Sequence, residues 1–221
     1  MNKFLRKILA PLPGLVRWYL SKKRSYRHED LTIEVLPGVF HPGLFFSTKM
    51  LLRYIAGQSL KGTSVLELGA GTGMISLQAA SMGAGATATD ISPLAVRNIY
   101  LNAIANKATV TIIQSDLFDN IPPQKFNWIF INPPYYAKKP RRPEDYAWFC
   151  GEQHEYFTAL FAQLPPYITS ETQVIMVLSQ VCDLQTIFRI ASQHKFEFVM
   201  RQEKRVWIDG KNYIFQIRRT T

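Results

Sequence analysis

The chain has few cysteines and no long apolar run. Its 221 residues include two cysteines, Cys150 and Cys182, so we expect neither a disulfide scaffold nor a cysteine-based zinc site, and we expect a reducing, cytoplasmic location. The four histidines suggest no metal site either. No stretch reaches about 18 consecutive apolar residues, which predicts the absence of a transmembrane segment. Hydrophobic residues make up 47% and charged residues 19%, a balance that excludes a disordered chain.

Negative charge is also scarce. The chain has 26 Lys and Arg against 16 Asp and Glu, a net charge of +10, and residues 1–30 hold eight of the basic residues with two acidic ones. Such a block suits contact with a polyanion or with an acidic membrane surface, and a solvated basic helix is the alternative. Prolines interrupt residues 1–47, so we predict a basic N-terminal extension there, made of a helix, an extended piece at 31–36 and a loop at 37–46. The second predicted unit is a domain at 48–221.

From residue 48 onward, a helical pattern is followed by apolar runs of strand length that alternate with further helical segments. Two runs, 128–131 and 174–178, are apolar throughout, as is typical of strands buried on both faces of a parallel sheet. This alternation predicts the α/β class, with a doubly wound, mostly parallel sheet. The expected strands are residues 64–68, 86–89, 109–113, 128–131 and 174–178. The expected helices after the first strand are residues 74–81, 93–106, about 152–164 and 183–192.

The C-terminal segment has a different pattern. Apolar residues at 206–208 and 213–217 flank Asp209-Gly210, a pair typical of two-residue hairpin turns of the primed type. We therefore predict an antiparallel hairpin at the edge of the parallel sheet.

A glycine-rich segment, Glu67-Leu68-Gly69-Ala70-Gly71-Thr72-Gly73, follows the first strand of the sheet. Glycines there let the backbone turn tightly and approach a ligand at the carboxyl edge, and a plain structural turn is the alternative. The dinucleotide-binding fingerprint is excluded because Met74 stands where its third glycine is needed. A P-loop is excluded because the segment has no lysine.

Two carboxylates follow the next two strands. Asp90 ends the second strand, where a carboxylate can accept hydrogen bonds from both ribose hydroxyls of a nucleoside, and Asp116 follows the third strand, where it can meet an adenine amine. A helix-initiating Asp90 and a solvated Asp116 are the alternatives. The two positions predict a nucleoside site across the strand ends.

The segment Asn132-Pro133-Pro134-Tyr135 follows the fourth strand directly. Two prolines cannot continue a β-ladder, so the chain must leave the sheet there with a stiff backbone. The Asn132 side chain and the Pro133 carbonyl can then accept both hydrogens of a planar NH2 group, and Tyr135 offers a face for stacking. A simple Pro-Pro turn is the alternative.

Together these motifs resemble those of class I S-adenosylmethionine-dependent methyltransferases. More narrowly, they resemble the small-domain group that contains release-factor glutamine N5-methyltransferases and N6-adenine or N2-guanine RNA methyltransferases. The likeness implies a Rossmann-like sheet of seven strands with an antiparallel C-terminal strand. The motifs that carry it are the 67–73 glycine segment, Asp90-Ile91-Ser92-Pro93, Asn102, Ser115-Asp116 and Asn132-Pro133-Pro134-Tyr135.

The resemblance implies S-adenosyl-L-methionine as the cofactor and assigns roles to individual residues. Those expected to be catalytic are Asn132, Pro133 and Tyr135. Those expected to contact the cofactor are Glu67, Gly69, Gly71, Gly73, Asp90, Asp116 and Thr48. Residues 136–151 interleave basic and aromatic side chains, which suits a phosphate backbone with a stacked base, and an ordinary surface loop is the alternative. The substrate contacts expected there and beside it are Pro134, Tyr136, Lys138, Arg141 and Trp148.

Three functions are compatible with these motifs. The expected function is methylation of a protein glutamine side chain (N5) in a translation factor, which the family resemblance favours, and the other two are alternatives. The basic N-terminus and the cluster at 138–142 favour an RNA or DNA base, at N6 of adenine or N2 of guanine. The third is a non-catalytic, cofactor-binding module associated with RNA, against which the intact 132–135 motif argues. The expected partner is accordingly a protein substrate or RNA.

Overall fold

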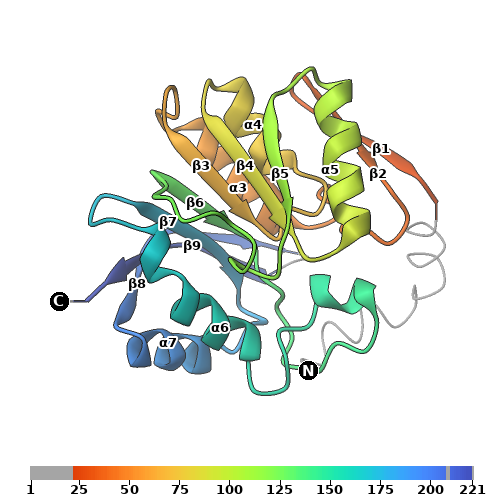
Figure 1. The fold of residues 1–221 in the computed structure, drawn as a ribbon. Coiled ribbons are helices and arrows are strands. Elements are labelled where there is room, and N and C mark those ends of the chain that lie inside the picture. Colours follow the sequence, from red (N-terminus) through yellow and green to blue (C-terminus); the bar gives the residue numbers. More distant parts are fainter. Residues whose placement is uncertain (1–21, 208–209, 221) are drawn as a thin grey trace.

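The computed structural model describes residues 22–207 and 210–220, and its central feature is a seven-stranded sheet in the order β5-β4-β3-β6-β7-β9-β8 (Figure 1). Strands β3 to β7 run parallel, β9 is antiparallel to β7, and β8 is antiparallel to β9. This confirms the predicted fold class. The strands are β3 (Ser64–Leu68), β4 (Gly85–Asp90), β5 (Val110–Gln114), β6 (Trp128–Ile131), β7 (Gln173–Ser179), β8 (Phe196–Val206) and β9 (Gly210–Arg219).

Helices cover both faces of the sheet (Figure 1). One hydrophobic cluster joins the sheet to α3 and α4, and another joins it to α6 and α7. Because β6 lies between them, Ile129 and Ile131 point into one cluster and Phe130 into the other, and all three are fully buried. The helices are α3 (Phe46–Ala56), α4 (Met74–Ser81), α5 (Pro93–Ala105), α6 (Glu155–Gln163), α7 (Leu184–Gln193) and the short 3-10 helices η1 (Pro143–Ala147) and η2 (Pro165–Tyr167).

The described part of the N-terminal segment begins with a β-hairpin of β1 (Arg24–His28) and β2 (Leu31–Val35). The prediction of a basic helix is therefore wrong for residues 24–28, and its remaining part at residues 1–21 lies outside the described residues. Exposure alternates along β1 with the period of a strand, and Glu29, at φ 50°, helps to form the tight turn into β2. Residues of β2 lie in the same hydrophobic cluster as α3. The boundary expected at residue 47 stays a prediction.

Three asparagines, two in α5 and one at its C-cap, hold β2 in place. Asn98, Asn102 and Asn106 are four residues apart, a rise of about 6 Å along a helix, while alternate residues of a strand are about 6.7 Å apart. The matching spacings let the three side-chain amides bond to the strand backbone at 2.7–2.9 Å. The residues that they contact are Thr32 and Glu34 of β2 and Leu36, which directly follows the strand.

The C-terminal hairpin is present but longer than expected. Its first arm was predicted at 206–208, and this is wrong, because β8 spans Phe196–Val206. The middle of β8 is an exposed run of charged and polar residues at 201–205, so it lacks the apolar alternation that identifies a strand. Of the turn predicted at Asp209-Gly210, residue 209 lies outside the described residues, and Gly210 is the first residue of β9.

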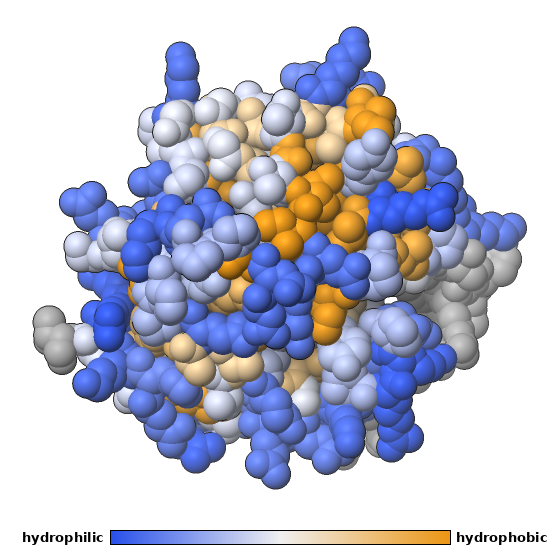
Figure 2. All heavy atoms as spheres, in the orientation of Figure 1, coloured by the Kyte–Doolittle hydropathy of each residue, from blue (hydrophilic) through white to orange (hydrophobic). Residues whose placement is uncertain are grey.

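The surface is mainly hydrophilic. Figure 2 shows hydrophilic side chains over most of the visible face, with apolar ones gathered near its centre and upper right, over β5 and α5. Within residues 22–207 and 210–220, no helix is long and apolar enough to cross a membrane.

Candidate functional site

The predicted site residues gather where the parallel strands end. The order of the sheet reverses between β3 and β6, so the connections after these two strands leave toward opposite faces. In open α/β sheets, a crevice at such a switch point is the usual place for a ligand. The glycine-rich segment follows β3 and the Asn-Pro-Pro-Tyr segment follows β6, which places both motifs at this point.

The glycine-rich segment turns through left-handed backbone conformations. Gly69 has φ 67°, and a Cβ added to it would have no heavy atom within 4 Å, so its backbone faces open space. Gly73 has φ 76°, and a Cβ there would lie 2.8 Å from Cγ2 of Ile99 on α5. The two positions therefore differ: Gly69 leaves space for a ligand, and Gly73 lets the loop pack against α5.

Asp90, at the end of β4, organises the backbone around this loop. Its Oδ2 accepts a hydrogen bond from the Gly71 N–H at 2.8 Å, and its Oδ1 accepts one from the Ser92 N–H at 2.9 Å. Burial raises the pKa of the Asp90 carboxyl above its ordinary value, and these hydrogen bonds oppose the shift. Each carboxylate oxygen keeps a further lone pair that can accept a hydrogen bond from a hydroxyl.

Glu67, on β3, is buried behind the loop. Its Oε2 accepts hydrogen bonds from Ser76 N at 2.7 Å and Ser76 Oγ at 2.6 Å, in the first turn of α4. Burial raises the pKa of the Glu67 carboxyl to about 7, partly offset by the bonds from Ser76. The carboxyl therefore connects β3 to the helix that follows the loop.

The Asn132 side chain is held from both sides. Its Nδ2 donates to Oγ1 of Thr48 at 3.4 Å, and its Oδ1 accepts from the Tyr135 hydroxyl at 3.1 Å. Thr48 is buried in the first turn of α3, 84 residues earlier in the chain. Pro133 and Pro134 are also buried. Three of the residues expected at the site are thus brought together around one amide.

Asp116 is exposed just after β5. Its charge acts on Tyr156, a residue that no motif in the sequence indicated. Tyr156 is partly buried near the start of α6, and burial raises the pKa of its hydroxyl, with smaller contributions from the charges of Asp116 and Asp90. The three residues come from different segments, which are the end of β4, the turn after β5 and α6. No spacing in the sequence marks Tyr156.

Trp148 belongs to an aromatic cluster above the glycine-rich segment. Its ring centroid lies 5.3 Å from that of Phe40 and 5.2 Å from that of Phe45, and the two phenylalanines stack at 4.9 Å. Phe40 is also the nearest side chain to a Cβ placed on Gly71, at 3.8 Å. The cluster therefore connects the segment before α3 to the loop at 136–151.

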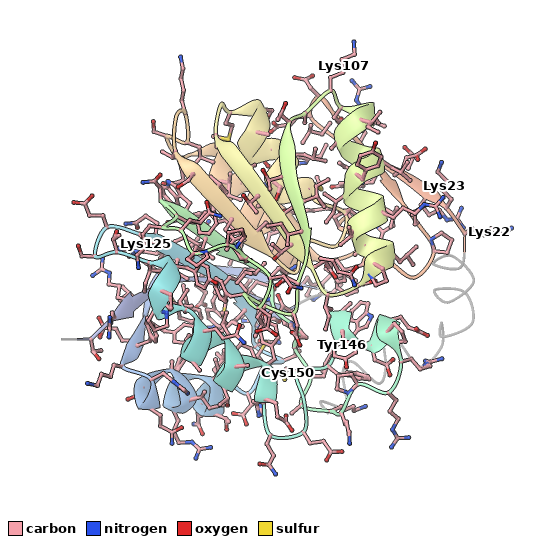
Figure 3. The ribbon with its side chains drawn as sticks, in the orientation of Figure 1. Lys22, Lys23, Lys107, Lys125, Tyr146 and Cys150 are labelled. Carbon is pink, nitrogen blue, oxygen red and sulfur yellow. The ribbon has the colours of Figure 1, made fainter. Side chains whose placement is uncertain are left out.

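The other expected substrate contacts lie along the 136–151 loop, which pairs with itself. Tyr136 bonds through its backbone to Trp148 and Cys150, each at 2.9 Å. Lys138 lies over the Phe149 ring at 5.4 Å. Figure 3 shows Tyr146 and Cys150 in this part of the molecule, on the segment that leads to α6. Lys138 and Arg141 line a hollow whose other members are Lys139, Asp145, Phe149 and Glu152.

The structure does not pair Lys138 or Arg141 with the Asn132 amide. Arg141 is exposed, and its backbone N–H donates to the Asp145 carboxylate at 3.0 Å, which stabilises the start of η1. Within the part of the chain that the structure describes, no group of three His, Cys, Asp or Glu side chains is placed to hold a metal ion.

Comparison with known proteins gives one matching family model, "Methyltransferase small domain", over residues 30–192. A candidate protein N5-glutamine methyltransferase of Methanocaldococcus jannaschii is 36% identical over 108 residues, covering 48% of this chain and 52% of the relative. Ribosomal RNA small subunit methyltransferase C of Vibrio cholerae is 32% identical over 124 residues, covering 55% of this chain and 35% of the relative. The chain thus matches about half or less of the length of these curated relatives.

Solved structures share the fold. The 16S rRNA N2 G1207 methyltransferase of T. thermophilus, solved with AdoMet and guanosine, aligns with a TM-score of 0.62 over 90% of this chain and 50% of that one, at 18% identity. A methyltransferase from Pyrococcus furiosus aligns with a TM-score of 0.65 over 96% of this chain and 98% of that one, also at 18% identity.

Proposed function

The chain belongs to the methyltransferase small domain family, and from this premise we propose that it is an S-adenosylmethionine-dependent N-methyltransferase that acts on a planar NH2 group. The observation that carries the proposal is the Asn132 amide, which Thr48 and Tyr135 hold at the end of β6. An amide held in this way presents a fixed hydrogen-bond acceptor beside the switch point of the sheet.

The residues around the glycine-rich segment fit the proposed cofactor. Open space at Gly69 admits a ligand close to the backbone, and the Asp90 oxygens have lone pairs left for ribose hydroxyls. Asp116, exposed at the next strand end, is the proposed contact of the adenine amine. Glu67 supports the segment through Ser76. When bound, S-adenosylmethionine supplies a methyl group on a positively charged sulfur.

The Asn132-Pro133 pair can overcome the low nucleophilicity of a planar NH2 nitrogen. The nitrogen of an amide or of an exocyclic base amine is a poor nucleophile, because its lone pair is delocalised. If Asn132 Oδ1 and the Pro133 carbonyl accept its two N–H groups, the nitrogen can become pyramidal and its lone pair can point at the methyl group. Alignment of reacting atoms at about 3–3.5 Å contributes several kcal/mol. The nitrogen would be positively charged after transfer and would then release one proton to solvent, so no strong base is needed beforehand.

Two substrates supply such a nitrogen, a glutamine side chain in a translation factor and a nucleic-acid base. The relative from M. jannaschii supports the first. The surplus of 26 basic over 16 acidic residues and the exposed cations of the 136–151 loop support the second. We favour the base, and the glutamine of a protein is the competing outcome of the test.

The test uses methyl-labelled S-adenosylmethionine, a cell lysate and the purified full chain. Nuclease treatment should destroy the labelled product of the wild-type protein, whereas a product destroyed only by protease would assign the glutamine substrate. Asn132→Ala should keep cofactor affinity within a few-fold and abolish transfer in a single turnover. A fully active Asn132→Ala protein would refute the assigned clamp, and absence of cofactor binding by the wild type would refute the whole proposal.

A further inference from the structure

The end of the β8–β9 hairpin, residues 204–207 and 210–212, carries an exposed tryptophan together with basic side chains. We propose that this hairpin end binds the single-stranded polynucleotide segment that flanks the target base, through Arg205, Trp207 and Lys211. The inference rests on the proposed function and names its substrate class. It differs from the contacts expected in the 136–151 loop, because it lies on the other side of β7 in the sheet.

The pairing of the strands places the hairpin end beside the candidate site. Asn212 pairs with Ser179, the last residue of β7, and the Gln180 N–H donates to the Lys211 carbonyl at 2.8 Å. The hairpin end therefore lies at the carboxyl edge of the sheet. β9 and β8 are the second and third strands from β6, which leads into Asn132. At about 4.8 Å per strand, this offset is roughly 10–15 Å.

One contact links the hairpin end to the residues that hold the amide. Lys204 Nζ lies 5.6 Å from the centroid of the Phe46 ring, at the first residue of α3. Thr48, the next-but-one residue, bonds to Asn132. Lys204 therefore faces α3, and Arg205 projects to the opposite face of the strand.

Trp207 is 95% exposed. The other two described tryptophans have aromatic neighbours: Trp128 stacks on Phe130 at 5.7 Å, and Trp148 packs against Phe45. Tryptophan has a large apolar surface that is usually buried, so full exposure at the edge that holds the candidate site indicates a binding role. An indole face can stack on any unpaired base.

Arg205 and Lys211 stand directly opposite each other in the β8–β9 register. Like charges in this arrangement destabilise a hairpin. Glu203 pairs with Lys211 at 2.8 Å and raises its pKa, while the charge of Arg205 opposes that shift. Residues 201–212 carry four basic and two acidic side chains. Glu203 compensates part of this charge, and the positive charge that remains on the segment is the reason to expect a polyanion here.

The combination of a stacking face and paired cations is the usual design for binding single strands without sequence preference. An unpaired strand also suits the chemistry, because a base must leave its stack before its amine can reach a clamp such as that of Asn132. A base in the site would leave its flanking phosphates and the next base within reach of the hairpin end.

The test measures binding of fluorescently labelled 15-nucleotide oligo(U) RNA and oligo(dT) DNA by anisotropy, and the tighter of the two identifies the kind of strand. Trp207→Ala should weaken binding roughly tenfold, the loss of one stacked base. Arg205→Gln should reduce the slope of log affinity against log salt by about one phosphate contact. The controls are Tyr100→Ala, whose side chain is 58% exposed on α5, and Lys107→Gln, which Figure 3 shows at the far end of α5. Both should bind as the wild type does.

Wild-type affinity in Trp207→Ala and Arg205→Gln, or no binding of either oligonucleotide by the wild type, would overturn the inference. A methyl-transfer assay on RNA separates it from the proposed function. Transfer with an unchanged KM in Trp207→Ala overturns the inference and leaves the function standing. Oligonucleotide binding that depends on Trp207, without methyl transfer to any substrate in the lysate, supports the inference and contradicts the function.

Discussion

The Tyr135 hydroxyl donates to Asn132 Oδ1 at 3.1 Å, so the oxygen proposed to receive a substrate N–H already has one partner in the structure. A carbonyl oxygen has two lone pairs, so this bond orients the amide and leaves one acceptor position. Thr48 holds the nitrogen end of the same amide. The two bonds therefore fix Oδ1 toward Tyr135 and Nδ2 toward Thr48. An asparagine on a turn without such partners would have no fixed orientation.

Tyr135→Phe is expected to slow methyl transfer about fivefold, with cofactor affinity unchanged. The lost hydrogen bond contributes about 1 kcal/mol, and without it the Asn132 amide can rotate. The effect should fall on kcat rather than on the dissociation constant of S-adenosylmethionine, because Tyr135 is assigned no contact with the cofactor. Single-turnover assays and calorimetry measure the two quantities. Tyr146→Phe, in η1 with a 48% exposed ring, is the matched control. An unchanged rate in Tyr135→Phe would show that Thr48 alone orients Asn132.

Gly69→Ala is expected to lose mainly cofactor affinity, whereas Gly73→Ala is expected to lose mainly stability. Both place a side chain at positive φ, which costs about 1–2 kcal/mol. At Gly73 the new methyl group also meets Ile99 at 2.8 Å, so this variant should lose more of its free energy of unfolding. At Gly69 the methyl group enters open space, so this variant should lose cofactor affinity instead. Urea unfolding and calorimetry on both proteins test the difference. Equal losses of stability and of affinity in the two variants would contradict it.

The buried Glu67 carboxyl predicts a pH dependence of stability. Its pKa in the folded protein is about 7, above the ordinary value of 4.5. The folded state therefore binds the proton more tightly than the unfolded state does. The resulting stabilisation is complete below about pH 4.5, declines as the pH rises, and is lost above about pH 7. The difference corresponds to about 3 kcal/mol.

Glu67→Gln isolates this contribution, because glutamine stays neutral and its carbonyl oxygen can still accept from Ser76. We expect the free energy of unfolding of the wild type, relative to Glu67→Gln, to fall by about 3 kcal/mol between pH 4.5 and pH 8. Urea unfolding at four pH values in this range measures the difference. A difference that stays constant, or that rises with pH, would contradict the assigned burial of the charge.

Much of the sheet could be predicted from the sequence. The apolar run at 128–131 and the strand at 64–68 have the bounds that were expected, because strands buried on both faces leave little ambiguity. The motifs at strand ends were also located correctly, since the carboxyl ends of parallel strands meet at one edge. What could not be predicted depended on tertiary contacts. The Asp116 charge acts on the Tyr156 hydroxyl only because α6 packs against the turn after β5, where Gln163 bonds to Phe118 and Asp119.

The two errors have a common physical origin. β1 and the middle of β8 are exposed strands rich in charge, and their hydrogen bonds to a neighbouring strand define them more than any apolar pattern does. The α5 asparagines were open to prediction, since Asn98, Asn102 and Asn106 repeat every four residues on one helix face. Their partner was not, because β2 lies more than 60 residues away.

Asn98 and Asn102 permit a prediction that separates stability from cofactor binding. Both are fully buried and bond to the backbone of β2, but only Asn102 also donates to the Thr72 carbonyl in the glycine-rich segment, at 3.0 Å. Each alanine variant leaves buried backbone groups without partners and should lose about 2–4 kcal/mol of its free energy of unfolding. Only Asn102→Ala should also weaken S-adenosylmethionine binding, by about tenfold. Asn106→Ala, in a more exposed place where water can replace the amide, should lose less than about 1 kcal/mol. Equal cofactor affinities in Asn98→Ala and Asn102→Ala would show that the Thr72 bond does not shape the loop.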